Sequence, residues 1–168
     1  MRLTVALMVV GFAVCCSRCV HATTTEDALA VTCPGHQQFA KFIDESARKY
    51  MLHPVTLVAL IFTESTCNPL AIGHEVRGRV GVGLGQPLTN SPAANGLTRS
   101  QLLDPRKNID ASAKWLAAMT VLCGDDLLLG FGAYASGKCS GGRQYAKRMA
   151  RTIARIWRAI HERGEARS

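Results

Sequence analysis

The sequence predicts a mainly helical protein with a single domain. Apolar residues recur at three- and four-residue steps along several segments, which is the periodicity of amphipathic helices. Pro54 and Pro105 each stand at the start of such a segment, in the place that proline prefers in the first turn of a helix. With 168 residues and no internal repeat or low-complexity linker, the chain is long enough for one domain with a substantial core.

The first 22 residues have the order of a secretory signal peptide. Arg2 is followed by an uncharged run over residues 3–14, and small residues precede an expected cleavage after Ala22. A retained membrane anchor is the alternative, but the apolar run is too short to span a bilayer comfortably. We therefore expect a periplasmic or secreted protein with no stable membrane span after removal of the leader.

Removal of these 22 residues from 168 would leave 146, residues 23–168, as the domain, with its core at about 33–163. The net charge of +8 would fall to +6, because Arg2 and Arg18 belong to the leader and the leader has no acidic residue. A basic protein favours polyanionic partners. Nucleic acid and an anionic cell envelope both qualify, and the export signal favours the envelope over nucleic acid.

Four cysteines remain in this domain, namely Cys33, Cys67, Cys123 and Cys139. An even number of cysteines in an exported domain predicts two disulfides, and the sequence leaves all three pairings open. Zinc binding is the competing interpretation, but these cysteines form no Cys-x-x-Cys pair and the histidines form no His-x-x-x-His step. We expect no metal and no cofactor.

The N-terminal half of the domain contains two expected helices. Residues 23–35 read as a polar lead-in, and residues 36–50 have the periodicity of a first helix. A second helix should begin at Pro54, after His53, and end at Asn68-Pro69, because the residue before a proline disfavours helical backbone. Its apolar residues are Val55, Leu57, Val58, Leu60 and Ile61.

Residues 72–95 are rich in glycine and interrupted by proline, so we expect loops there, with a short hairpin at most. Helical periodicity returns after Asp104-Pro105, where Asp104 is expected to cap a helix and not to act in chemistry. Further helices are expected over residues 125–135 and 142–163. The last carries a basic stripe, which we interpret as a solvated face; binding of an anionic envelope polymer or a secretion partner is the alternative.

Glu64 is the residue that most clearly indicates chemistry. Counted along the second helix, it shares the face of Leu57, Leu60 and Ile61. Burial raises the pKa of a carboxyl group, and a raised pKa suits a general acid that must hold its proton near neutral pH. Cleavage of a glycosidic bond needs such an acid. A glutamate at a helix end that turns to solvent is the other interpretation.

Further motifs follow in order along the chain. Asn68-Pro69-Leu70-Ala71 comes after Glu64-Ser65, and Gly83-Leu84-Gly85-Gln86 comes next. Leu103-Asp104-Pro105 with Asn108-Ile109, and then Ala133-Tyr134-Ala135-Ser136-Gly137, complete the set. In this order the motifs resemble those of the lytic transglycosylases of the soluble-lytic, goose-lysozyme-related type, and they span most of the mature chain.

The resemblance implies a lysozyme-like domain that cleaves the MurNAc–GlcNAc bond of peptidoglycan glycan strands. Glu64 would protonate the glycosidic oxygen and then, as a carboxylate, take the proton of the muramic acid 6-hydroxyl to leave a 1,6-anhydro end. Ser65, Gly83 and Gln86 would contact substrate, and Tyr134 would bond or orient Glu64. Loop structure for Gln86 and core packing for Tyr134 are the alternatives. The small size resembles enzymes that open the wall locally for secretion or conjugation machines.

The sequence departs from the family pattern at two positions. Gly85 stands where the family usually has methionine, and Ala135 stands where it usually has asparagine. Both substitutions are expected to lose contacts near the cleft, which a disulfide between neighbouring motifs would replace. The resemblance implies the bridges Cys67–Cys139 and Cys33–Cys123.

Two other functions stay open at this point. Glu75 follows Glu64 in the glycine-rich stretch and could position water, which would make the protein a hydrolytic muramidase. Alternatively, the domain is a non-catalytic peptidoglycan-binding assembly protein in which the altered cleft no longer turns over.

Overall fold

The computed structural model describes residues 24–166. The predicted cleavage site after Ala22 lies outside the described residues and stays a prediction. The helices are α1 (Thr25–Thr32), α2 (Ala40–Lys49), α3 (Pro54–Ser65), α4 (Arg99–Leu102), α5 (Pro105–Leu122), α6 (Leu127–Ser136) and α7 (Arg143–Glu165), and the strands are β1 (Ile72–Val76) and β2 (Arg79–Val82). The prediction of a mainly helical protein is confirmed.

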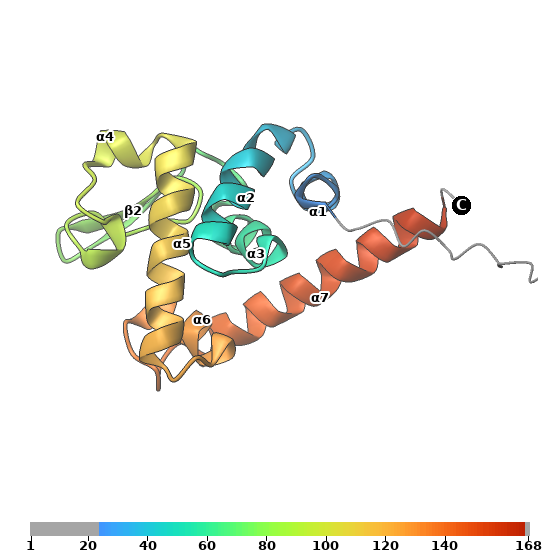
Figure 1. Cartoon of the computed structure of the whole chain (residues 1–168). Coiled ribbons are helices and arrows are strands. Elements are labelled where there is room, and N and C mark those ends of the chain that lie inside the picture. The colour runs from blue at the N-terminus through green and yellow to red at the C-terminus, as the bar shows by residue number, and fades with distance from the viewer. Residues whose placement is uncertain (1–23, 167–168) are drawn as a thin grey trace, which may run out of the picture.

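Helix α5 stands between two parts of the molecule (Figure 1). The hairpin of β1 and β2 and the short helix α4 lie on one side, over a small core of Val82, Ala94, Leu102 and Ala111. Helices α1, α2 and α3 lie on the other side over the main core. The long helix α7 starts beside α6, packs on α3 and α1, and runs out to the C-terminus.

The expected short hairpin is present. Strands β1 and β2 pair antiparallel, with Ile72 opposite Val82 and Val76 opposite Arg79. The two residues of the turn, Arg77 and Gly78, have φ angles of 52° and 74°. Positive φ at both central positions is the backbone that suits the right-handed twist of a two-residue hairpin.

The expected helix starts at Pro54 and Pro105 are found, but α3 ends at Ser65, before the expected Asn68-Pro69. The His53 side chain accepts a hydrogen bond from the Val55 N–H, and the Asp104 side chain accepts one from the Lys107 N–H at 3.0 Å. Helix α3 ends because Thr66 takes left-handed backbone at φ 53°, with its N–H bonded to the carbonyls of the preceding turn. Glu64 therefore lies in the last turn of α3.

The expected polar lead-in over residues 23–35 is wrong, because helix α1 forms there. Thr24 caps it: its hydroxyl accepts from the Asp27 N–H at 3.0 Å, and the Asp27 carboxylate accepts from the Thr24 N–H at 3.2 Å. Ala28 and Leu29 are fully buried in the main core. The apolar segment within α1 is too short to show helical periodicity, so the sequence pattern does not predict this helix. Packing against α3 and α7 stabilises it.

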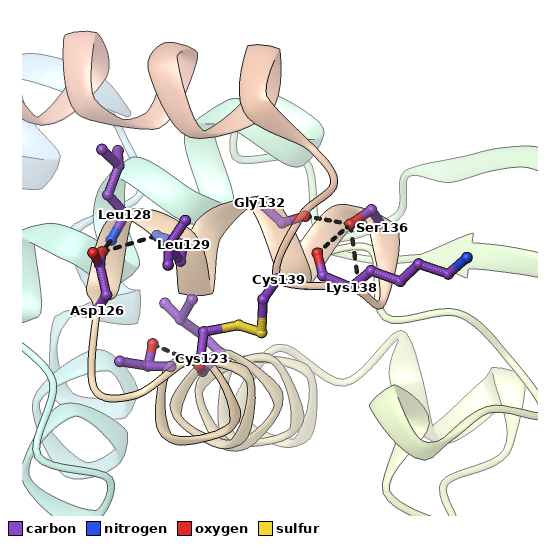
Figure 2. Close-up of a disulfide and its surroundings, with 10 residues drawn as sticks. Cys123, Asp126, Leu128, Leu129, Gly132, Ser136, Lys138 and Cys139 are labelled. Atoms are coloured by element: carbon purple, nitrogen blue, oxygen red, sulfur yellow. Dashed lines mark hydrogen bonds between the residues drawn. A yellow bond between two sulfur atoms is a disulfide. The ribbon is translucent and has the colours of Figure 1, made fainter.

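The described cysteines form two disulfides, as expected, but the pairing implied by the resemblance is wrong. Cys33 pairs with Cys67, and Cys123 pairs with Cys139. The first bridge joins the end of α1 to the turn after α3. Because α1 was not predicted, the sequence did not indicate that Cys33 lies beside Cys67. The second joins the end of α5 to the loop after α6. Between these two helices, the Asp126 carboxylate caps α6 through the N–H groups of Leu128 and Leu129 (Figure 2).

Within residues 24–166, no single helix is long and apolar enough to cross a membrane; the bent pair α5 and α6 meets the length and composition criteria together. In the same part of the chain, no three histidine, cysteine, aspartate or glutamate side chains are grouped so that they could hold a metal ion.

Candidate active site

Glu64 lies where a buried helix meets the surface. The α3 residues on its face, Leu57, Leu60 and Ile61, are at most 1% exposed, which confirms the expected apolar face. Glu64 itself is partly buried. The positive φ of Thr66 turns the chain away directly after the last helical turn and keeps the carboxyl group at the helix end.

The hydrogen-bond partner of Glu64 is Tyr145, in the first turn of α7. The Tyr145 hydroxyl donates to Glu64 Oε1 at 2.5 Å. The Tyr145 ring stacks on the ring of Tyr134 at 6.3 Å between centroids, and the guanidinium of Arg148 lies 5.1 Å from the Tyr145 ring centroid. Packing on both sides fixes the hydroxyl that holds the carboxyl group.

Burial raises the pKa of Glu64, because removal of water disfavours the charged carboxylate. The Tyr145 hydroxyl and the positive charge of Arg148 act in the opposite direction and are the smaller influences. Burial and the nearby Glu64 charge raise the pKa of the Tyr145 hydroxyl, so it stays a donor. The site can therefore hold a proton on Glu64 and still stabilise the carboxylate after the proton leaves.

Tyr145 was not predicted as a site residue, because in the sequence it is one of the apolar residues whose spacing indicates the helix over residues 142–163. Tyr134 was expected to bond or orient Glu64; a bond between them is not among the hydrogen bonds of the described residues, and an orienting role stays a prediction. The Tyr134 hydroxyl instead donates to the Gly85 carbonyl oxygen at 2.6 Å. Tyr134 thus stacks on the residue that bonds Glu64, and its hydroxyl ties the glycine-rich segment to α6.

Asn108 holds that segment in place from α5. Its Oδ1 accepts from the Gly85 N–H at 2.8 Å, and its Nδ2 donates to the carbonyl oxygens of Val82 and Leu102, each at 2.7 Å. Asn108 is fully buried. Its amide therefore satisfies three buried backbone groups at once, and it links the hairpin, α4 and α5.

Gly83 is required by close packing. Its φ is 73°, and a Cβ atom there would lie 2.4 Å from Asn108 Nδ2 and 2.6 Å from the Leu102 oxygen. Its N–H donates to the Ala71 oxygen at 2.8 Å and its own carbonyl accepts from Gln86. The Gly83 N–H is used within the loop and is not free to donate to a substrate, whereas its carbonyl oxygen keeps a second acceptor site.

Gln86 has the bonds of the alternative role in loop structure. Its Nε2 donates to the Gly83 oxygen at 2.7 Å and to the Ala71 oxygen at 3.2 Å. Ser65 is likewise engaged, because its hydroxyl donates to the Ile61 oxygen at 3.0 Å. Contacts of Gln86 and Ser65 with a sugar remain predictions.

The departure at Gly85 has a steric explanation. A Cβ atom at this position would lie 2.1 Å from Ser112 Oγ and 2.6 Å from Ser112 Cβ. Ser112 is buried on α5, so it occupies the space that a methionine side chain would enter. Ala135, the other departure, is exposed, and no Cys67–Cys139 bridge compensates for it.

Glu75, the other candidate carboxylate, is exposed on β1. None of the hydrogen bonds found in the described part of the chain joins Glu75 to Glu64. The geometry around Glu64 is therefore built from one acid, one tyrosine hydroxyl and one nearby arginine, Arg148.

Comparison with curated proteins finds two relatives, both named membrane-bound lytic murein transglycosylase C. They come from Klebsiella pneumoniae subsp. pneumoniae and from Klebsiella pneumoniae strain 342. Each is 31% identical to this chain in a match that covers 49% of this chain and 24% of the relative. The chain thus spans about a quarter of the length of these curated relatives. No solved structure matches it at a significant level.

A family model described as Transglycosylase SLT domain matches residues 41–156. The matched region is more than half of the chain and contains Glu64, Asn108, Tyr134 and Tyr145. The resemblance seen in the motifs is therefore confirmed, and so is the lysozyme-like, mainly helical fold class. The chain belongs to the transglycosylase SLT domain family.

Proposed function

We propose that this protein is a peptidoglycan lytic transglycosylase that cleaves the MurNAc–GlcNAc bond and leaves 1,6-anhydro-muramic ends. The observation that carries the proposal is the environment of Glu64: a carboxyl group in the last turn of a buried helix, with a pKa raised by burial and one oxygen held by Tyr145 at 2.5 Å. Membership of the SLT family supports this chemistry.

The reaction needs one acid in two roles. Protonated Glu64 donates its proton to the glycosidic oxygen while the bond from that oxygen to the muramic C1 breaks, and positive charge develops on the ring. The carboxylate then takes the proton of the muramic 6-hydroxyl as the 6-oxygen bonds to C1. The proton balance closes, because Glu64 ends protonated. The Tyr145 hydroxyl stabilises the carboxylate between the two steps.

The alternative reaction, hydrolysis, needs a second carboxylate that activates or replaces water. Glu75 is exposed on the hairpin and has no bond to Glu64, so it supports this reaction weakly. The single-acid site favours the anhydro product.

A place in the cell envelope follows from the substrate. The relatives carry the name of a membrane-bound murein transglycosylase, and the predicted leader of this chain would direct it across a membrane. We propose a periplasmic location and local wall opening for an envelope-spanning secretion or conjugation machine. The role in such a machine rests on resemblance alone.

Incubation of the purified protein with purified cell wall tests the proposal, with mass spectrometry of the released fragments. We expect 1,6-anhydro ends from the wild type and no fragments from Glu64→Gln. The matched variant Glu75→Gln should release the same anhydro fragments as the wild type. Reducing ends that disappear in Glu75→Gln would identify a muramidase, and an intact wall with bound protein would identify a binding module.

A further inference from the structure

A basic groove lies beside the active site and is not explained by bond cleavage. It is a cavity of about 450 Å³ between the end of α3 and one face of α7. We call it the arginine groove. Its lining residues are Phe62, Thr63, Thr66, Arg148, Arg151, Thr152 and Arg155.

None of the three arginines of the groove forms an ion pair within residues 24–166, although Arg148 lies near enough to Glu64 for its charge to act on that carboxyl group. The two ion pairs found within residues 24–166 join Lys49 to Asp110 and Arg106 to Glu45, away from α7. Arg148 lies over the Tyr145 ring, and Arg155 lies 5.1 Å from the centroid of the Phe62 ring, so these two guanidinium groups are held by aromatic faces. Three neighbouring positive charges that form no ion pair in the described part of the chain favour an anionic ligand.

The groove also contains an unsatisfied polar group. Thr63 is part of its wall, and the Thr63 hydroxyl is buried without a hydrogen-bond partner. Buried hydroxyls normally have a partner. A polar ligand in the cavity would supply one after a rotation of the side chain.

The position of the groove ties it to Glu64. Thr63 and Thr66 flank Glu64 in sequence, and Arg148 both lines the groove and acts on the Glu64 charge. Arg148, Arg151 and Arg155 follow at three- and four-residue steps, so they share one face of α7. Seven residues of helix rise about 10 Å, so the arginine row leads away from the acid by that length.

We propose that the arginine groove binds the carboxylates of the peptide stem attached to the muramic acid residue next to the cleaved bond. The proposal rests on the function proposed above, since that function brings muramic acid to Glu64. An extended stem of four residues reaches about 13 Å, which matches the arginine row. Carboxylates on such a stem would meet guanidinium groups that can bind them through two parallel hydrogen bonds. The sugar rings of a glycan strand carry no comparable negative charge, so they do not account for three arginines.

Binding of the free stem peptide to the purified protein tests the proposal without any need for turnover. The probe is the tetrapeptide alanine–γ-glutamate–diaminopimelate–alanine. Its binding is measured by the changes in amide chemical shifts of the ¹⁵N-labelled protein. We expect shifts at Thr63, Thr66 and the α7 residues of the groove. Arg151→Gln should weaken the affinity about tenfold or more. Arg163→Gln, which removes the same charge from the far end of α7, should leave the affinity unchanged.

A second probe, the same peptide with its carboxylates converted to amides, tests whether charge is recognised. Equal affinity for the amidated peptide, shifts outside the groove, or equal affinity in Arg151→Gln would overturn the proposal. So would stronger binding of a glycerol phosphate polymer at the same residues. Arg155→Gln serves as a second variant if Arg151→Gln fails to fold.

Cleavage of peptide-free glycan strands, measured in parallel, separates the two proposals. Anhydro ends without peptide binding would refute the stem site and leave the proposed function standing. Peptide binding in the groove without cleavage of any glycan would refute the proposed function and leave the groove as a site for the stem.

Discussion

The two sides of Glu64 differ in how their polar groups are used. On one side, the backbone of residues 82–86 and its neighbours is hydrogen-bonded by Asn108, Gln86 and the Tyr134 hydroxyl. We call these residues the neutral wall. On the other side, the arginine groove presents three positive charges that form no ion pair in the described part of the chain. The neutral wall therefore fixes the backbone near Glu64, whereas the arginine groove has charged groups that remain available to a ligand.

Glu64→Gln should have the largest effect, because it removes the carboxyl group that serves as both acid and base in the proposed reaction. We expect the rate of glycan cleavage to fall by about a thousandfold or more, or about 4 kcal/mol in activation free energy. Fragment release from purified wall measures it. Activity within tenfold of wild type would remove Glu64 from the mechanism.

The same substitution should stabilise the protein at neutral pH. Burial raises the folded-state pKa of Glu64, so the favourable contribution of its protonated form is complete below the unfolded value of about 4.3 and is lost as pH rises through the folded pKa. Glutamine does not ionise. Thermal unfolding should therefore show the variant above wild type at pH 7 and equal to it near pH 4, and the opposite trend would contradict the assigned shift.

Asn108→Leu should break the neutral wall. It removes the side-chain partner of the Gly85 N–H and of the Val82 and Leu102 carbonyls, at a cost of about 3 kcal/mol in the free energy of unfolding. Urea unfolding measures the loss.

Asn95→Gly is the matched control for this variant. Asn95 is exposed, accepts a bond only from Lys114 among the side chains, and has a φ of 52° that glycine tolerates. The control should change stability by less than about 1 kcal/mol. Equal losses of unfolding free energy in the two variants would mean that the buried hydrogen bonds of Asn108 contribute no more to stability than an exposed one.

Gly85→Ala should destabilise the protein by about 2 kcal/mol, because the added Cβ meets Ser112. Combination with Ser112→Gly should recover part of this loss, with a favourable coupling of about 1 kcal/mol. A double-mutant cycle by urea unfolding measures the coupling. Strict additivity would refute the steric explanation for the absent methionine.

Tyr145→Phe should have the smallest effect on the cleavage rate, and it should also shift the pH dependence of that rate. Loss of the bond to the carboxylate should slow cleavage about tenfold, or about 1.4 kcal/mol. Because that bond lowers the pKa of Glu64, its removal should move the high-pH limb of the rate profile to higher pH. A limb that stays in place or moves to lower pH would show that Tyr145 does not act on Glu64.

Sequence reasoning predicted most of the fold because its signals are local. The caps at His53 and Asp104 and the periodicity of the long helices all depend on neighbours in sequence. Helix α1 and the short α4 were missed, since eight and four residues are too few for periodicity to show. Tertiary packing, not intrinsic preference, stabilises such short helices.

The site was predicted in part for the same reason. The burial of Glu64 follows from residues three, four and seven positions earlier in one helix. The bond from Tyr145 joins residues 81 positions apart, so no local spacing reveals it. The prediction of the disulfide pairing failed for a similar reason, because helix α1, which the pattern did not show, brings Cys33 to Cys67.

The central claim is that Glu64 keeps its proton because its surroundings are dry. The most direct test is a pH titration of the Glu64 side-chain carboxyl carbon by ¹³C NMR, with the resonance assigned by its absence in Glu64→Gln. We predict a midpoint clearly above the ordinary glutamate value of about 4.3. A midpoint at or below that value would contradict the account, whatever the protein does to peptidoglycan.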